Sequence, residues 1–454
     1  MKLDNELKEN LLNLVVQTKK KKVIFLPKQY RLVVNDKFEL FYRGIIRAFD
    51  PYQFYIKIDC EKGKPYPRYF TYTPTKEEVG EYEIRVRVFD NYGDLIDEDT
   101  TKLVVVEAKA PSKKANILCI GDSLTCAGYW SFEGFRRFAL NGGSPEGLGF
   151  TDSLNLIGTI KKKVGDDEIG HEGYGSWQWK TFCTNLVQSK TSAVWVDVLE
   201  HNKTQEDQHS IWENNGRKWI LETIEEKRLK FKRGPENNEL APEVVGEFVH
   251  FENAFNKENI KIESYKYESA NPFWNEEIND IDFIHYCKKN NFPHPDYVYI
   301  LLSWNGLYIP YNDKFTMQEE FAPKLLNRIH EQFPECKIRC MGIQLNSLNG
   351  GIAASYGAKG PYHDVYGDVV TVFNYNRWLE NLCLSDEFKD FTEYLDVMGQ
   401  FDVEYNMPYK MEKVNARSQV TEMIGTNGVH PSLDGYMQIG DVFYRSLVHE
   451  MAKR

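Results

Sequence analysis

The pattern of hydrophobic and polar positions changes once along the chain, near residue 110. Between residues 21 and 108, short runs of alternating or β-branched residues are separated by turns, as in YRLVV, FELFYRGI and QFYIKIDC. Such runs are typical of half-buried strands. The tetrapeptide NYGD at 91–94 separates the last two runs and predicts a hairpin. We therefore expect a small all-β sandwich over 21–108, followed by a short linker at 109–114.

After residue 114 the apolar runs become nearly continuous and alternate with helical stretches. The predicted strands are 116–120, 154–160, 297–304 and 337–345, and the predicted helices are 317–333, 370–386 and 433–450. Apolar strands separated by helices indicate a parallel sheet that is covered on both faces. We expect a three-layer α/β domain over 115–454, with its active site at the carboxyl ends of the strands.

Two segments stand apart from this scheme. Residues 1–20 place leucines at helical spacing between charges, which predicts an amphipathic helix that packs on its own domain or on a second copy. Residues 195–270 are charged, rich in Asn and partly aperiodic. We interpret them as an insertion in the α/β domain, either a small subdomain or a lid.

Composition narrows the class of protein. The 454 residues are 42% hydrophobic and 14% aromatic, which argues against disorder. A net charge of −11 without a dense basic stripe disfavours nucleic acid as a partner. No apolar run is long enough to span a membrane, and the N-terminal run is too short for a signal peptide. The eight cysteines form no CxxC pair, so we expect free thiols, no structural metal and a cytoplasmic protein as made.

Candidate chemistry lies at two distant points. Gly121-Asp122-Ser123-Leu124 follows the strand 116–120 directly, so the Ser123 hydroxyl would be held at the carboxyl edge of the sheet. An ordinary turn capped by Asp122 is the alternative interpretation. His430 stands in NGVHP just before the final helix, where a neutral imidazole could accept the proton of a serine.

Together with two further blocks, these residues resemble the SGNH (GDSL) hydrolase family of esterases and lipases. The second block is GHEGYGSW at 170–177 and the third is SWNGL at 303–307. The resemblance covers about 112–454 and implies the α/β fold described above. The phrase VGEYEIRVRVFDNYG at 79–93 resembles immunoglobulin-like or cadherin-like sandwiches, modules that space, dock or bind.

The SGNH resemblance assigns a role to each matching position. It makes Ser123 the nucleophile and, through its own N–H, one donor to the oxyanion. It makes the backbone at Gly175 or Ser176 and the side-chain amide of Asn305 the other donors, and His430 the base. The family usually has Gly where this chain has Ser176. No metal or organic cofactor is implied.

The last block departs from the family pattern. The family usually has Asp three residues before the His, and this chain has Asn427. An amide oxygen can orient the imidazole but stabilises its positive charge less than a carboxylate does. Three outcomes are open: a Ser–His dyad oriented by Asn427 or a backbone carbonyl, a carboxylate recruited from Asp402 or Glu404, or weakened activity.

Aromatic residues near the blocks bear on the substrate. Trp177, Trp274 and Trp304 could line a sugar-binding cleft, although core packing would explain them equally well. With the family resemblance, they favour a serine esterase that removes acetyl groups from a carbohydrate. The alternative is a phage tail or surface protein that binds glycans, with a retained or weakened esterase fold and oligomers assembled through the N-terminal region. A lipase would instead prefer long acyl chains.

Overall fold

The structure is a computed structural model that describes residues 22–164, 167–187, 193–233, 244–251, 257–302, 304–307, 309–357 and 364–453. The helix expected over 1–20 and Ser303 of the third block lie outside these residues. The chain divides into two compact units. Unit 1 comprises residues 1–178, 293–319 and 333–454, and unit 2 comprises 179–292 and 320–332.

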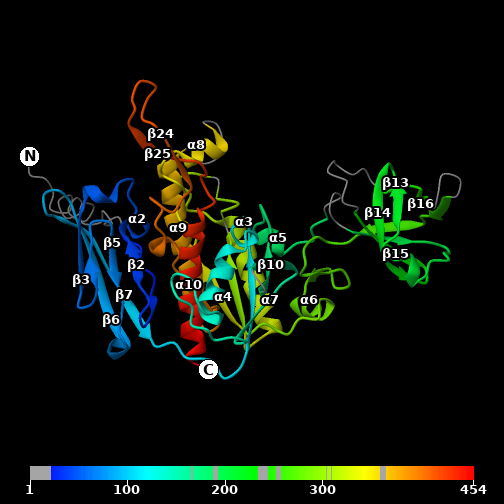
Figure 1. Cartoon of the computed structure of the whole chain (residues 1–454), viewed down its shortest axis with the longest axis horizontal. Coiled ribbons are helices and arrows are strands. Elements are labelled where there is room, and N and C mark those ends of the chain that lie inside the picture. The colour runs from blue at the N-terminus through cyan, green and yellow to red at the C-terminus, as the bar shows by residue number, and fades with distance from the viewer. Residues whose placement is uncertain are drawn as a thin grey trace, which may run out of the picture. The chain divides into compact units, whose positions relative to one another are not determined.

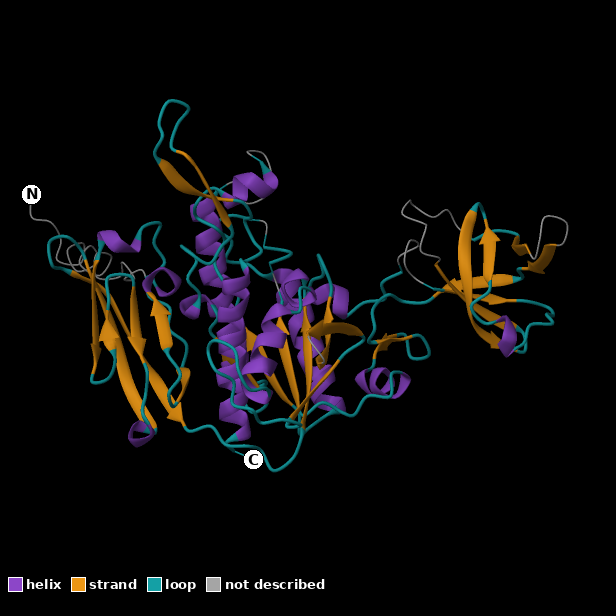
Figure 2. Cartoon of the chain, viewed as in Figure 1, coloured by secondary structure: helices purple, strands orange, loops and turns teal. Residues whose placement is uncertain are grey.

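Unit 1 begins with a β-rich region that we call the N-terminal β module, residues 22–107 (Figures 1 and 2). A four-stranded sheet has the order β1-β7-β6-β3, and a three-stranded sheet has the order β2-β5-β4. The strands are β1 (Gln29–Val33), β2 (Phe38–Phe41), β3 (Tyr55–Cys60), β4 (Lys64–Pro65), β5 (Tyr69–Tyr72), β6 (Gly80–Phe89) and β7 (Leu95–Val106). A short helix, α2 (Tyr42–Ile45), follows β2.

Alternation of side chains gives this module its own core. Ile84, Val86 and Val88 of β6 are fully buried, whereas the residues between them point outward. Phe38 and Phe70 from the smaller sheet belong to the same hydrophobic cluster. The predicted turn at 91–94 is present, since β6 and β7 form an antiparallel pair on either side of it.

The rest of unit 1 is a mixed α/β region built on a second sheet. Its strands are β8 (Ala115–Gly121), β9 (Leu154–Ile157), β10 (Ile160–Val164), β11 (Asp167–Gly173), β21 (Tyr297–Leu301), β22 (Lys337–Met341) and β23 (Thr392–Leu395). The order is β10-β11-β8-β21-β22-β23, with β9 also paired to β8. Strands β11, β8, β21, β22 and β23 run parallel to one another.

Three details differ from the sequence expectation. The run 154–160 is broken, because Leu154–Ile157 pairs parallel to β8 and β10 turns back antiparallel to β11. The second motif block at 170–177, expected after the strand 154–160, begins inside a further strand, β11, which ends at Gly173. Strand β23 was not predicted, since its four residues, TEYL, are too few for a clear pattern.

The helices of this region are α3 (Ser123–Cys126), α4 (Tyr129–Ala139), α8 (Gly351–Tyr356), α9 (Val365–Leu384) and α10 (Leu433–Met451). The hydroxyl of Ser432 caps α10 by accepting the N–H of Gly435. Phe443 of α10 packs edge-on against both Trp130 of α4 and Tyr299 of β21. Helix α10 therefore packs against both α4 and strand β21. A small hairpin, β24 (Tyr409–Lys413) with β25 (Thr421–Gly425), precedes it.

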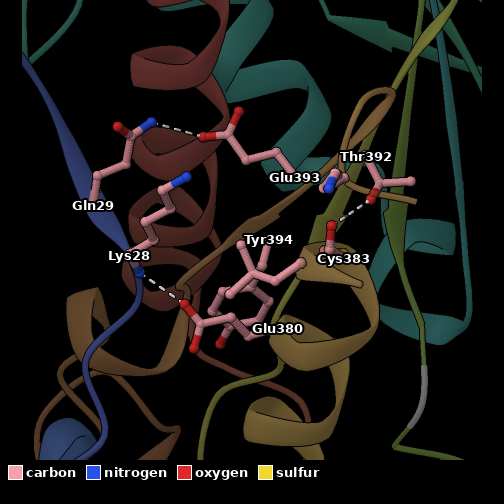
Figure 3. A pocket seen from close by; sticks show the side chains of 9 residues that line it. Lys28, Gln29, Glu380, Cys383, Thr392, Glu393 and Tyr394 are labelled. Carbon is pink, nitrogen blue, oxygen red and sulfur yellow. Dashed lines mark hydrogen bonds between the residues drawn. The ribbon is translucent and has the colours of Figure 1, made fainter. Parts of the chain in front are cut away.

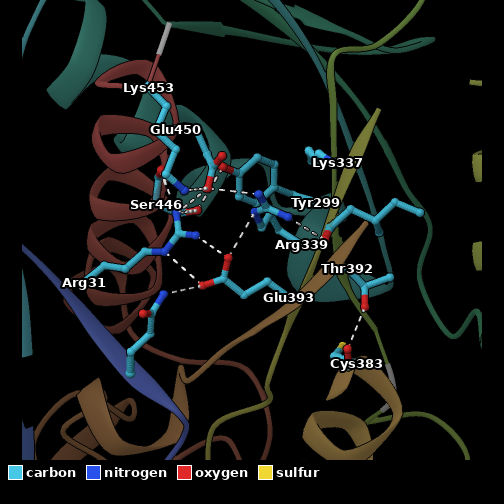
Figure 4. A network of polar contacts seen from close by, with 12 residues as sticks. Arg31, Tyr299, Lys337, Arg339, Cys383, Thr392, Glu393, Ser446, Glu450 and Lys453 are labelled. Atoms are coloured by element: carbon cyan, nitrogen blue, oxygen red, sulfur yellow. Dashed lines mark hydrogen bonds and ion pairs between the residues drawn. The ribbon is translucent and has the colours of Figure 1, made fainter. Parts of the chain in front are cut away.

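Buried charges join the N-terminal β module to α10 and β23. Arg31 of β1 is 6% exposed and binds Glu393 of β23 and Glu450 of α10 (Figure 4). Arg339 of β22 reaches the same Glu450 at 2.9 Å. Both arginines therefore share carboxylates, and the desolvation of each charge is offset by its neighbours.

A second buried group of charges lies at Asp36, between β1 and β2. Its carboxylate binds Arg137 of α4 and Arg445 of α10, each at 2.6 Å. The guanidinium of Arg445 also donates to the backbone carbonyl of Lys37. Burial raises the pKa of Asp36, but the two arginines outweigh it and hold the pKa below its usual value. The carboxylate is thus the common partner of two helices.

Unit 2 contains its own antiparallel sheet, with the order β17-β16-β13-β14-β15-β12-β18. The strands are β12 (Val194–Asp197), β13 (Ile211–Asn214), β14 (Arg217–Glu225), β15 (Arg228–Arg233), β16 (Glu247–Phe251), β17 (Lys257–Lys261) and β18 (Ser264–Tyr267). Its core includes Trp212, Trp219, Phe231 and Phe248. Unit 2 also holds α5 (Trp179–Phe182), β19 (Trp274–Asn275), β20 (Asp280–Ile281), α6 (Phe283–Lys289) and most of α7 (Thr316–Gln332).

Within the described residues, no helix is long and apolar enough to cross a membrane.

Candidate active site

Ser123 lies where strand β8 ends and α3 begins. Asp122 precedes α3 as its N-cap, and its carboxylate accepts the backbone N–H of Leu124 at 3.0 Å. The cap predicted for Asp122 is therefore present. Because Ser123 occupies the first turn, its own N–H has no acceptor within the helix.

The structure brings His430 to Ser123 across 307 positions of sequence. The His430 Nε2 lies 2.8 Å from the Ser123 Oγ. His430 belongs to the loop between β25 and α10, which Pro431 and the Ser432 cap hold at the start of the helix. A serine hydroxyl and an imidazole at this distance can exchange a proton.

Electrostatics favour the basic form of this histidine. Burial in the loop lowers the pKa of His430 below its usual value, because a charged imidazolium is poorly solvated there. The ring is therefore neutral at pH 7, and Nε2 can accept the hydroxyl proton. The cost appears later in a reaction, when the imidazolium must form in the same environment.

Asn427 contacts the backbone of the histidine loop. Its Oδ1 accepts the N–H of Val429 at 3.0 Å and the N–H of His430 at 2.9 Å. Such a bond pattern fixes the turn that carries the imidazole. Among the described residues, no carboxylate accepts a hydrogen bond from the His430 Nδ1.

The two carboxylates considered as recruits are engaged with the N-terminal β module. Asp402 binds Arg68 at 2.6 Å. Glu404 binds Arg68 at 2.8 Å and accepts the hydroxyl of Tyr52 at 2.6 Å. The structure therefore places both with partners other than His430.

The second block supplies a tight turn beside Ser123. The N–H of Tyr174 donates to the carbonyl of Gly121, which ties the end of β11 to the end of β8. Ser176 has φ of 66°, the left-handed conformation that favours glycine. The backbone at this position therefore suits glycine better than serine. A side chain at Gly175 would meet no atom within 4 Å, so the space beside that residue is open.

Asn305 of the third block lies against the second block. Its Nδ2 donates to the carbonyl of Trp177 at 3.2 Å. This bond orients the side-chain amide of Asn305.

The three tryptophans proposed as substrate contacts have different surroundings. Trp177 stacks on Tyr174 with ring centroids 4.0 Å apart, and it is 8% exposed. Trp304 is 2% exposed, which favours the core-packing alternative. Trp274 belongs to unit 2, whereas Ser123 and His430 belong to unit 1.

Sequence reasoning missed the residues that support the histidine loop. Gln344, fully buried after β22, donates from Nε2 to the carbonyl of Val429 at 2.9 Å. The N–H of Ser347 donates to the carbonyl of Gly428, and the hydroxyl of Ser355 accepts the Gly428 N–H. The signal was available, because polar residues begin inside the fourth predicted strand at Gln344 and continue after it with Asn346 and Ser347.

The described residues contain no group of three or more His, Cys, Asp or Glu side chains arranged to hold a metal ion.

No known family model matches the sequence, and no curated protein matches it. Among solved structures there is a weak resemblance to a peptidoglycan O-acetylesterase, with 12% identity and a TM-score of 0.28 over 75% of this chain and 93% of that one. A Bacteroides ovatus glucan-locus protein, SGBP-B, has a TM-score of 0.15 at 8% identity, covering 54% of this chain and 44% of its own. Tandem Ig repeats of Dlar have a TM-score of 0.14 at 10% identity, covering 53% of this chain and 93% of their own. Scores this low carry no argument.

Proposed function

We propose that the chain is a serine esterase of the SGNH type that removes acetyl groups from a carbohydrate. The observation that carries this proposal is the 2.8 Å approach of the His430 Nε2 to the Ser123 Oγ at the carboxyl edge of a largely parallel sheet. The N-terminal β module is, in the same proposal, an immunoglobulin-like sandwich, and the α/β region is a three-layer SGNH domain.

In the proposed reaction, the His430 Nε2 takes the proton of the Ser123 hydroxyl as Oγ attacks the ester carbonyl. The resulting oxyanion accepts hydrogen bonds from the Ser123 N–H, from the backbone at Gly175 or Ser176, and from the Asn305 Nδ2. His430 then returns the proton to the departing sugar hydroxyl. Water then attacks the acetyl-serine ester while the His430 Nε2 takes its proton. His430 returns that proton to the Ser123 Oγ as acetate leaves.

The proposed centre is a Ser–His dyad. The contacts of Asn427 support this form, because its Oδ1 holds the backbone of Val429 and His430. Such a dyad lacks a carboxylate to stabilise the imidazolium, so a lower rate than that of a full triad is expected.

The test is hydrolysis of p-nitrophenyl acetate, butyrate and a longer ester by the wild type, Ser123→Ala and Asn427→Asp. We expect acetate turnover that Ser123→Ala abolishes. Asn427→Asp should raise kcat about 10-fold, because a carboxylate beside the loop stabilises the imidazolium. It should also move the acid limb of the pH profile upward, since the same charge raises the pKa of His430.

A glycan-binding protein with a weakened esterase fold is the second candidate. It is favoured by the absence, among the described residues, of a carboxylate on the His430 Nδ1. No turnover of any ester by the folded wild type, together with retained glycan binding, would replace the enzyme proposal with this one. A preference for the longest ester would point to a lipase instead.

A further inference from the structure

Unit 2 has a cavity of about 310 Å³ between its sheet and the segment that leads into α6. Its lining includes three aromatic rings, which come from β12, β18 and β19: Trp195, Tyr267 and Trp274. Basic, acidic and amide side chains complete the wall. A volume of this size is at the small end of ligand sites and fits one or two sugar rings.

Trp195 faces away from the core of its own sheet. Its neighbours Val194 and Val196 are fully buried in that core, and the alternation of a strand puts Trp195 on the opposite face. The Arg228 guanidinium lies 4.6 Å from the centre of its ring. The ring is held in place by this cation–π contact while its residue remains partly exposed.

Trp274 also lines the cavity. Its indole N–H is buried and has no acceptor among the described residues. A buried donor without an acceptor is unfavourable, so an acceptor supplied by a ligand would stabilise a complex. The neighbouring Asn271 anchors the segment, because its Nδ2 donates to the carbonyls of Thr181, Phe182 and Thr184.

Four of the charged side chains that line the cavity form two ion pairs with one another. Lys266 binds Glu276 at 3.1 Å, and Lys289 binds Glu268 at 2.6 Å. A strongly charged ligand would have to compete with these pairs. A ligand rich in hydroxyl groups can add hydrogen bonds to both partners without separating them.

We infer that this cavity binds a neutral oligosaccharide. The C–H face of a sugar ring would stack on Trp195, and a ring or hydroxyl oxygen would accept the Trp274 N–H. This inference goes beyond the proposed esterase, because none of its residues belongs to the Ser–His centre and binding requires no hydrolysis.

The experiment uses the full chain with Ser123→Ala, so that no ester is cleaved during the measurement. Cellotetraose, xylotetraose and chitotetraose are titrated by calorimetry, with tetragalacturonate as the charged comparison. We expect at least one neutral tetrasaccharide to bind more tightly than tetragalacturonate. Trp195→Ala should weaken that binding at least 10-fold, and Trp195→Phe should restore part of it. Tyr92→Ala, an exposed aromatic on the β6–β7 hairpin, is the matched control and should change nothing.

Trp274→Phe tests the same site with a smaller aromatic ring. It removes the indole N–H together with part of the ring system, so we expect a roughly 5-fold weaker complex to which both losses contribute. The inference is overturned if no neutral tetrasaccharide binds at millimolar concentration, or if tetragalacturonate binds best. Unchanged affinity in folded Trp195→Ala or in Trp274→Phe also overturns it.

Discussion

The two β-rich regions differ in where their buried polar groups find partners. The N-terminal β module directs Arg31 and Asp36 outward, to carboxylates and arginines of α10, β23 and α4. In the sheet of unit 2, the buried amide of Asn214 instead bonds to the carbonyls of Val245 and Glu247 in the same region. A module whose buried charges are paired elsewhere cannot satisfy them alone. We infer that the first region is part of the α/β fold, whereas the second is self-contained.

This difference bears on the candidate active site. The partners of Arg31 and Asp36 include Glu450 and Arg445 of α10. Helix α10 begins at Leu433, three residues after His430. The module therefore helps to fix the helix whose start carries the proposed base, and a role only as a spacer is disfavoured.

The largest effect is expected from Asp36→Asn. The substitution leaves Arg137 and Arg445 buried without their shared carboxylate, which should lower the free energy of unfolding by about 4 kcal/mol. Urea unfolding followed by circular dichroism measures it. Because α10 is affected, ester hydrolysis should be lost at a lower urea concentration as well.

The matched control is Asp59→Asn, which removes a partly exposed ion pair with Arg87 on the strands β3 and β6. We expect little or no change there, because solvent screens such pairs. Equal stability of Asp36→Asn and the wild type would show that the buried ion pairs of Asp36 do not stabilise the N-terminal β module against α4 and α10.

A core substitution in unit 2 should have a slightly smaller and more local effect. Phe231 stacks on Phe248 with centroids 3.9 Å apart and is fully buried. Phe231→Ala should cost about 3 kcal/mol. Hydrogen–deuterium exchange should rise in β13–β16, while β1–β7 and α10 keep their protection.

Phe70→Ala in the core of the N-terminal β module is the comparison variant. It should raise exchange both in that module and in α10, since the two share buried ion pairs. Raised exchange of α10 in Phe231→Ala would contradict the self-contained character of the unit 2 sheet.

Sequence patterns predicted several strands and helices of the α/β region but not the buried ion pairs. Continuous apolar runs predicted β8, β21 and β22, and a helical stretch over 433–450 predicted α10. The motif blocks predicted that Ser123 and His430 would meet. The pattern could not tell the buried Arg31 and Asp36 from solvent-facing charges, because their partners lie hundreds of residues away.

The strands of the inserted region, 195–270, also could not be predicted from the local sequence pattern. Its strands are short and carry many charged residues, as in RKWILETIE of β14, so their alternation was too weak to indicate seven strands. The burial of Trp304 also depends on neighbours that no local pattern reveals. Local signals thus identified the elements of the α/β region better than the surroundings of single side chains.

The last predicted effect depends on pH and concerns a pocket lined by the N-terminal β module, α9 and β23. Glu380 of α9 lines a cavity of about 200 Å³ together with Lys28, and its Oε1 accepts the backbone N–H of Lys28 at 2.7 Å (Figure 3). Burial raises the pKa of Glu380 from 4.5 to about 7. The folded chain therefore keeps this proton at pH values where the unfolded chain has released it.

The sign of the pH dependence follows from this difference. Below pH 4.5 both states are protonated, and between 4.5 and about 7 only the folded state is, so stability falls as the pH rises. A shift from 4.5 to about 7 corresponds to a loss of up to about 3 kcal/mol at pH 8. Glu380→Gln keeps an oxygen for the Lys28 N–H and removes the titration. The variant should match the wild type at pH 4.5 in urea unfolding and exceed it at pH 8.

Exposed Glu61 of the same module provides the control, since Glu61→Gln should leave the pH dependence unchanged. If Glu380→Gln instead lost stability at pH 8, the ionised carboxylate would be a favourable partner at this junction. The contact between the N-terminal β module and α9 would then depend on a charged carboxylate, and the module would be bound more tightly at high pH than at low pH.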